Sequence, residues 1–352
     1  MSMVDWSLAR QVARLAAGTG DEGAPPADLA GVCAEMEGHV AEYTGLAPAT
    51  PVPGPELISR GEWASVNLDS LAQLLDPVAE RLDRRLDFAG PLAGALKAGA
   101  AATLAAEAGL VLGYVAQRVL GQYEISLLGG EAPPRLLFVA PNLRKAVREL
   151  EVDADPFHRW ICAHELTHAF QFQGVPWLRE HLSGMVSRYL STVEVRIERG
   201  AAGGLPSLPD PAKLVEAFRE GGLAALVQTK EQRALMGRMQ AAMAVVEGYS
   251  EHVMDAIAPE AIPGQEALRA ALDARRHSRS APERLIQRLL GLDMKMRQYE
   301  QGKTFCDAVA DAAGMEALNR VWDSPESLPS ERELEHPAEW LTRVGPAPAP
   351  AA

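Results

Sequence analysis

Residues 160–172 read WICAHELTHAFQF and are the most informative segment of this 352-residue chain. The H-E-L-T-H run places two histidines four residues apart, so both imidazoles leave the same face of a helix. Such spacing is typical of a zinc site, with His164 and His168 as ligands. Glu165 is the predicted general base, because it lies where it can take a proton from a water activated by zinc. The simpler alternative is an ordinary helix whose two histidines bind no metal.

The flanking residues predict that the motif lies in the middle of its helix. Asp155 and Pro156 form a helix-start signal, with an acidic N-cap followed by proline at the first helical position. Gly174, with Pro176 beyond it, is the matching stop signal. Apolar anchoring between these limits comes from Phe157, Trp160, Ile161, Phe170 and Phe172.

A catalytic zinc site needs a third protein ligand that leaves one coordination position open. The extended metzincin pattern would require glycine at position 171 and histidine at position 174. The chain has Gln171 and Gly174 instead, so that subclass is excluded. A glutamate on a later helix is the other known solution.

Glu247 is the favoured third ligand. It interrupts an apolar helical face, where a carboxylate is costly unless it is paired or binds metal. Gly248 follows it, and a glycine inside a helix predicts close approach of another backbone, for which we expect the zinc helix. Glu251, one turn on, could accept the second N–H of a ligand histidine. His252, Glu251 and His181 remain alternative ligands, and an ion pair with an arginine is the non-metal alternative for Glu247.

A zinc hydrolase also needs a donor that stabilises the developing oxyanion. Tyr249 and His252 are the candidate catalytic residues of this kind, and Arg297 and Tyr299 are further options. Each could equally be a packing or hydrogen-bonding residue, and the sequence does not choose among them.

The remaining pattern predicts a mainly α protein with a small β-sheet, an α+β fold. We expect one domain over residues 1–343, with two possible lobes around the metal, and a flexible Pro/Ala tail at 344–352. A small-residue helix occupies 91–120, and a proline-rich link runs from Pro48 to Pro55. Two runs, Gln122–Leu128 and Arg135–Val139, predict a β-hairpin. Helical spacing or length predicts further helices near 6–16, 63–78, 181–198, 212–226, 231–257, 281–300 and 304–320, with a Gly/Pro loop at 199–211.

Composition narrows the class of protein. The net charge is −13 and no basic stripe is present, which argues against nucleic acid as a partner. Lys97, Glu107 and Arg118 interrupt the apolar segment 91–120, so a membrane span is not expected. Three widely separated cysteines predict no disulfide framework. Without a recognisable signal peptide, we expect a reduced, cytoplasmic protein.

These motifs together resemble the zincin-like metallopeptidase family, often labelled "coenzyme F420 biosynthesis associated" in actinobacteria. The resemblance supports His164, Glu165 and His168, and less directly Glu247, on matching positions. It implies a mostly helical zincin-like fold, and an edge strand that binds peptide, for which Arg135–Val139 is the candidate. The segments that carry it are 43–46, 60–67, 121–123, 139–142, 160–172, 246–255 and 295–302, with Trp340 near the end.

The first functional hypothesis is a zinc-dependent hydrolase, a metallopeptidase or amide hydrolase acting on a peptide or small amide. The second is a zincin scaffold that binds zinc or a protein partner without catalysis. An intact Glu165 favours the first, since a structural zinc site needs no base. A direct step in cofactor metabolism is the third hypothesis.

Overall fold

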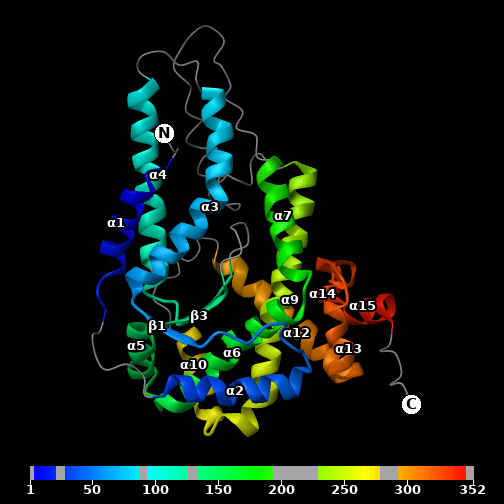
Figure 1. The fold of residues 1–352 in the computed structure, drawn as a ribbon. Coiled ribbons are helices and arrows are strands. Elements are labelled where there is room, and N and C mark those ends of the chain that lie inside the picture. The colour runs from blue at the N-terminus through cyan, green and yellow to red at the C-terminus, as the bar shows by residue number, and fades with distance from the viewer. Residues whose placement is uncertain are drawn as a thin grey trace. The chain divides into compact units, whose positions relative to one another are not determined.

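The computed structural model describes residues 4–20, 28–86, 93–125, 133–192, 229–277 and 292–345. Within these ranges helices predominate and one three-stranded sheet is present, which confirms the predicted mainly α, α+β class (Figure 1). The expected helix at 212–226, the loop at 199–211 and the tail residues 346–352 lie outside the described residues.

The chain divides into two compact units. The first unit comprises Met1–Ser183 and Val253–Arg275, and the second comprises Gly184–His252 and Arg276–Ala352. Helices α7 (Leu178–Thr192) and α9 (Lys230–Ala261) each contribute residues to both. The expectation of one domain over 1–343 stays a prediction.

The sheet belongs to the first unit and consists of β1 (Pro55–Ile58), β2 (Gly121–Glu124) and β3 (Arg135–Val139) in the order β1-β3-β2. β3 pairs antiparallel with β2, as the hairpin prediction requires, and parallel with β1. The expectation that β3 is an edge strand is therefore wrong, because it lies between two partners. β1 begins at the end of the predicted proline-rich link, and its partner is too distant in sequence for a local pattern to reveal it.

Three helices of the first unit share a hydrophobic core with the sheet. They are α1 (Trp6–Ala17), α3 (Arg60–Leu86) and α4 (Ala93–Ala116). α1 and α4 lie side by side (Figure 1). A side chain at Gly109 or Gly113 of α4 would overlap the α1 backbone, at the carbonyl oxygens of Ala9 and Ala13. The small-residue segment is thus a closely packed helix, as predicted. No described helix is long and apolar enough to cross a membrane.

The helix that carries the H-E-L-T-H run also belongs to the first unit. Helix α6 (Ala154–Gly174) packs along α2 (Leu29–Thr44), and α5 (Ala140–Leu150) and α10 (Gln265–His277) complete the unit (Figure 1). Cys33 of α2 and Cys162 of α6 meet in this contact, with their Sγ atoms 2.9 Å apart as free thiols.

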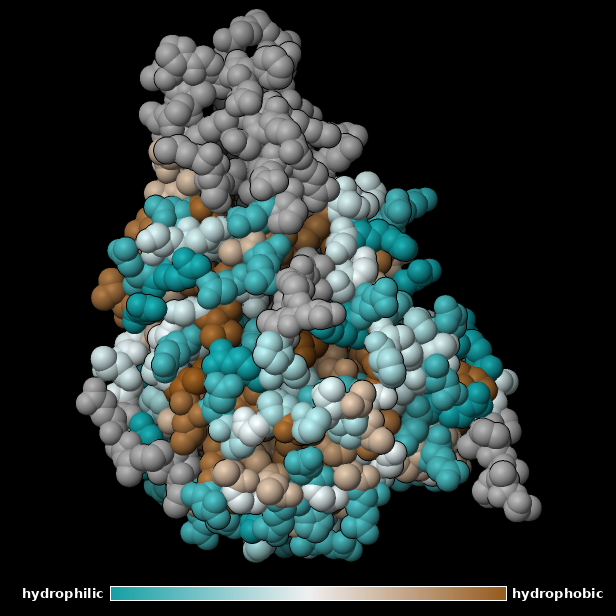
Figure 2. All heavy atoms as spheres, viewed as in Figure 1, coloured by the Kyte–Doolittle hydropathy of each residue, from teal (hydrophilic) through white to brown (hydrophobic). Residues whose placement is uncertain are grey.

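The second unit is built around α12 (Leu292–Ala313), which contacts the short helices after it. Trp340 is fully buried; its ring packs edge-on against Phe305, and its Nε1 donates to the Ser327 carbonyl at 2.7 Å. The short elements are α13 (Met315–Asn319), η2 (Arg320–Trp322), η3 (Pro325–Ser327), α14 (Glu331–Glu335) and α15 (Pro337–Val344). On the face drawn in Figure 2, hydrophobic residues are interspersed with hydrophilic ones over the described elements.

Candidate metal centre

Helix α6 presents the H-E-L-T-H run near its middle. It begins after its N-cap Asp153, two residues before the predicted N-cap Asp155, so Pro156 is the third helical residue rather than the first; it ends at Gly174, the predicted stop. Phe157, Ile161 and Phe170 are almost completely buried and fix the helix in its unit. The predicted ligands therefore stand on a rigid element, as a site of defined geometry requires.

The two histidines converge. Nε2 of His164 lies 3.2 Å from Nε2 of His168, and the rings meet edge-on with centroids 4.7 Å apart. Nδ1 of His168 is 2.9 Å from the amide oxygen of Gln171, a fully buried side chain. Because an amide oxygen only accepts, this contact places the ring proton on Nδ1 and leaves the Nε2 lone pair available.

Glu165 is held against strand β2. Its Oε2 accepts a 2.8 Å hydrogen bond from the backbone N–H of Tyr123, and its side chain is 7% exposed. A Cβ at Gly121 would lie 2.8 Å from Cγ of Glu165, so only glycine allows the strand to come this close. Tyr123 is itself fixed, because Gln173 donates to its hydroxyl at 3.0 Å and Thr50 donates to Gln173. The candidate base thus has a defined position next to an outer strand.

Glu247 is the third residue that the structure brings to the histidines. One potential ligand atom each from His164, His168 and Glu247 lie within 4.8 Å of one another. It is the one group of three His, Cys, Asp or Glu ligands with such spacing in the part of the chain that the structure describes. The alternatives His181, Glu251 and His252 are not members of it.

The partner of Gly248 differs from expectation. We expected the zinc helix to approach this glycine, but a Cβ here would overlap the backbone of Gly302 on α12. A Cβ at Gly302 would in turn overlap the carbonyl of Ala244. The glycine does mark a close helix contact, but within the second unit, where α9 crosses α12.

Tyr249 lies in the core of the second unit. Its side chain is completely buried, its ring packs edge-on against Trp322, and its hydroxyl donates to Oδ1 of Asn319 at 2.8 Å. The hydroxyl already has an acceptor in this core, so the function proposed below does not rely on Tyr249.

His252 interacts with Asp307, which in turn interacts with Lys303. Its Nδ1 lies 2.8 Å from Oδ1 of Asp307, and Oδ2 of Asp307 accepts from Nζ of Lys303 at 2.5 Å. Burial favours the neutral acid, yet Lys303 and His252 hold the pKa of Asp307 below its usual value. An ionised Asp307 fixes the orientation of the His252 ring. The side chains of Arg297 and Tyr299 lie outside the described residues.

Comparison with known proteins agrees with this geometry. A family model described as zincin-like metallopeptidase matches residues 4–341. The chain belongs to this family. A crystal structure from Chloroflexus aurantiacus, described as "a putative hydrolase with a novel fold", has 31% sequence identity and a TM-score of 0.69. That match covers 97% of this chain and 98% of the other. A search of curated proteins gave no match.

The residues present fit the metal that the zincin-like metallopeptidase family implies. Two imidazole nitrogens and one carboxylate form a donor set of the kind that catalytic zinc sites use. The Nε2 atoms of His164 and His168 lie 3.2 Å apart, and the ring proton of His168 is on Nδ1. This arrangement suits the binding of one cation by both Nε2 atoms. Neither comparison mentions coenzyme F420, so that association stays a prediction.

Sequence reasoning missed three features of the site. Gln171 follows His168 by three residues on the same helix, a spacing that places the two side chains in contact and could have identified it. The Tyr123 N–H is a backbone group, and Asp307 is far from His252 in sequence, so no local pattern marks either.

Proposed function

We propose that this chain is a zinc-dependent hydrolase of peptides or small amides, with His164, His168 and Glu247 as the zinc ligands and Glu165 as the general base. The observation that carries the proposal is the convergence of the two Nε2 atoms beside a carboxylate that β2 holds in place. Membership in a metallopeptidase family and the likeness to a described hydrolase support it. Zinc, when bound, supplies positive charge that polarises a carbonyl and makes water more acidic.

Each protein group then has a task. Glu165 takes the proton of the attacking water and delivers it to the leaving nitrogen. The Tyr123 N–H donates to Oε2 of Glu165 and so fixes the orientation of this carboxylate. His252, oriented by Asp307, is the proposed donor to the oxyanion. Gln171 keeps His168 in the tautomer that binds metal.

A substrate strand would add to β2 rather than to β3. β2 is one of the two outer strands of the order β1-β3-β2, and it lies against Glu165 through Gly121 and Tyr123. Peptides commonly bind such an edge through backbone hydrogen bonds. This assignment replaces Arg135–Val139 as the candidate peptide-binding strand.

Metal content tests the ligands. We expect about one zinc per chain in the wild type, as a single three-ligand site predicts. The double variant His164→Ala/His168→Ala should lose it, and Glu247→Gln should bind zinc more weakly. Glu260→Gln, an exposed glutamate further along α9, is the matched control and should retain the metal. Full zinc in Glu247→Gln would exclude that residue as the third ligand.

Turnover tests the base. Glu165→Gln should retain zinc but lower the rate of hydrolysis of a peptide or aryl-amide library by about 10²–10⁴-fold, the usual contribution of a general base. A zinc-loaded wild type that cleaves nothing in the library would favour the alternative of a non-catalytic scaffold that binds zinc or a protein partner.

A further inference from the structure

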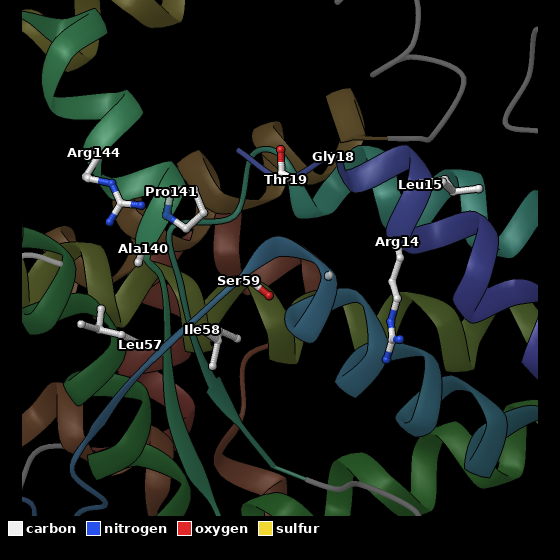
Figure 3. Close-up of a pocket in the computed structure, with 11 residues that line it drawn as sticks. Arg14, Leu15, Gly18, Thr19, Leu57, Ile58, Ser59, Ala140, Pro141 and Arg144 are labelled. Carbon is white, nitrogen blue, oxygen red and sulfur yellow. The ribbon is translucent and has the colours of Figure 1, made fainter. Parts of the chain in front are cut away.

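A pocket lies in the first unit, and its lining includes no residue of the candidate metal centre. It has a volume of about 660 Å³ and lies where the end of α1, the end of β1 and the starts of α3 and α5 meet (Figure 3). That volume lies within the range of small-molecule sites. None of its lining residues is on α6 or α9. The proposed hydrolase chemistry therefore leaves this pocket without a role.

Among the described residues, the charged members of the lining are Arg14 and Arg144, both cationic. Figure 3 shows the two arginines on opposite sides, with Ser59 and Ile58 between them. In a chain with 47 acidic and 34 basic residues, a pocket whose described charged lining residues are both arginines is distinctive. Glu62 is near enough to Arg14 to interact, and its carboxylate, which also accepts from the Ser59 N–H at 2.7 Å, offsets part of this positive charge.

A third arginine lies beside the pocket. Arg60, between the lining residues Ser59 and Gly61, is 9% exposed, and burial lowers its pKa. Its Nε donates to Oδ1 of Asn142 at 2.7 Å, and no carboxylate among the described residues pairs with it. Asn142 is anchored in turn to the carbonyls of Ala116 and Val119. A buried guanidinium held by a neutral amide adds positive potential beside the pocket.

The rest of the lining is apolar. Leu15 is 83% exposed and Leu57 is 39% exposed, two of the few large hydrophobic side chains that remain exposed among the described residues. Ile58, Ala140 and Pro141 continue this surface. Exposed hydrophobic residues beside two arginines suit a ligand that has an apolar group and an anionic group.

Arg60, at the start of α3, and Asn142, in α5, meet beside the pocket without a part in the proposed zinc chemistry. We propose that this pocket binds a small organic anion, a carboxylate or phosphate monoester with an apolar group, through Arg14 and Arg144. The anion lies over the N-terminus of α5, which has no side-chain cap.

Calorimetric titration tests the proposal with four probes: benzoate, phenyl phosphate, inorganic phosphate, and benzyl alcohol as the neutral control. The full chain is titrated as wild type and as His164→Ala/His168→Ala. The comparison distinguishes binding of the anion in the pocket from binding of the anion to the metal. We expect an aryl anion to bind both proteins equally, more tightly than inorganic phosphate, with no heat from benzyl alcohol. Preference for benzoate or for phenyl phosphate identifies the head group.

Arginine variants locate the site. Arg144→Gln and Arg14→Gln should each weaken binding about tenfold or more, the effect of losing one charged hydrogen bond. Arg148→Gln, four residues after Arg144 on the same helix and not in the lining, should bind like the wild type. Arg14 is exposed, so its variant should fold even if the Arg144 variant does not.

Three outcomes would overturn the proposal. They are the absence of anion binding in the wild type, binding that vanishes with the metal ligands, and equal affinity in Arg14→Gln and Arg148→Gln. Binding confined to vesicles of anionic lipid would also reject a small-molecule site and would assign the arginines to a membrane surface.

Discussion

Gln171 accepts the Nδ1 proton of His168 at 2.9 Å. It is fully buried one turn from its partner, so its position is fixed by the same helix that carries the ligand. The sequence excluded a metzincin site because residue 171 is not glycine and residue 174 is not histidine. In this chain the side chain at position 171 instead fixes the tautomer of the ligand His168.

Gln171→Leu should lower zinc affinity by about 10–100-fold, the usual cost of losing a hydrogen-bond partner of a metal ligand. Gln171→Glu should preserve affinity, because a carboxylate also accepts the proton. Competition with a chelator measures both. Circular dichroism of the metal-free variants is the control, and equal affinity in all three proteins would contradict the assigned role.

Cysteine reactivity is a second prediction at this scale. Cys33, Cys162 and Cys306 are buried thiols. The adjacent Cys33 thiol, followed by burial, raises the pKa of Cys162, and burial raises that of Cys306. Because the thiolate is the reactive form, native protein should react slowly with a thiol reagent and should show three thiols in denaturant. Rapid reaction of one thiol in native protein would show that the α2–α6 contact opens.

At the scale of elements, the crossing of α9 and α12 is the tightest helix contact that the glycines reveal. The helix that carries Glu247 is locked to α12 through Gly248 and Gly302, whose backbones touch. The rigidity of the proposed third ligand therefore comes from this crossing.

Gly302→Ala should destabilise the protein by about 1–3 kcal/mol, the cost of overpacking a tight contact. Thermal unfolding measures the change. Gly184→Ala on α7 is the matched control, since nothing lies within 4 Å of a Cβ there and alanine is the better helix former. If both variants lost stability equally, the close crossing would not be the cause.

Elements with local signals were predictable. The start of α6 was predicted to within two residues from Asp155 and Pro156, and its end from Gly174. The antiparallel pairing of β2 with β3 follows from two strand-like runs separated by glycines and prolines. The position of β3 in the sheet was not predictable, because it depends on β1, a strand of four residues beside prolines. The helix opposite Gly248 was also missed, since a small residue predicts close approach without naming the partner.

For the molecule as a whole, we expect the free energy of unfolding to decrease as pH falls. Burial lowers the pKa of His158, so the unfolded chain binds this proton first as pH falls below about 6.5. Hydrogen bonds from Ser59 lower the pKa of Glu62, and Arg135 does so for Glu56. Groups with a lowered folded-state pKa give stability above their unfolded value and lose it as pH falls through the folded value.

Chemical denaturation between pH 8 and pH 4 should therefore give a midpoint that is highest above pH 6.5 and falls in two ranges. The first decline starts below about 6.5 for His158, and the second below about 4.5 for the glutamates. His158→Asn should remove the first decline and keep the second. A midpoint that rises on acidification would contradict both assignments.

The parallel pairing of β1 with β3 also has a consequence for synthesis of the chain. Pro55 pairs with Leu136, so about 80 residues must leave the ribosome before β1 finds its neighbour, a delay of several seconds at ordinary elongation rates. A waiting strand can pair wrongly with other chains. Because Pro51, Pro53 and Pro55 lack backbone N–H groups, another chain cannot form a full set of β-sheet hydrogen bonds with this segment. The prolines that obscured this strand in the sequence are its protection against aggregation while the rest of the sheet is made.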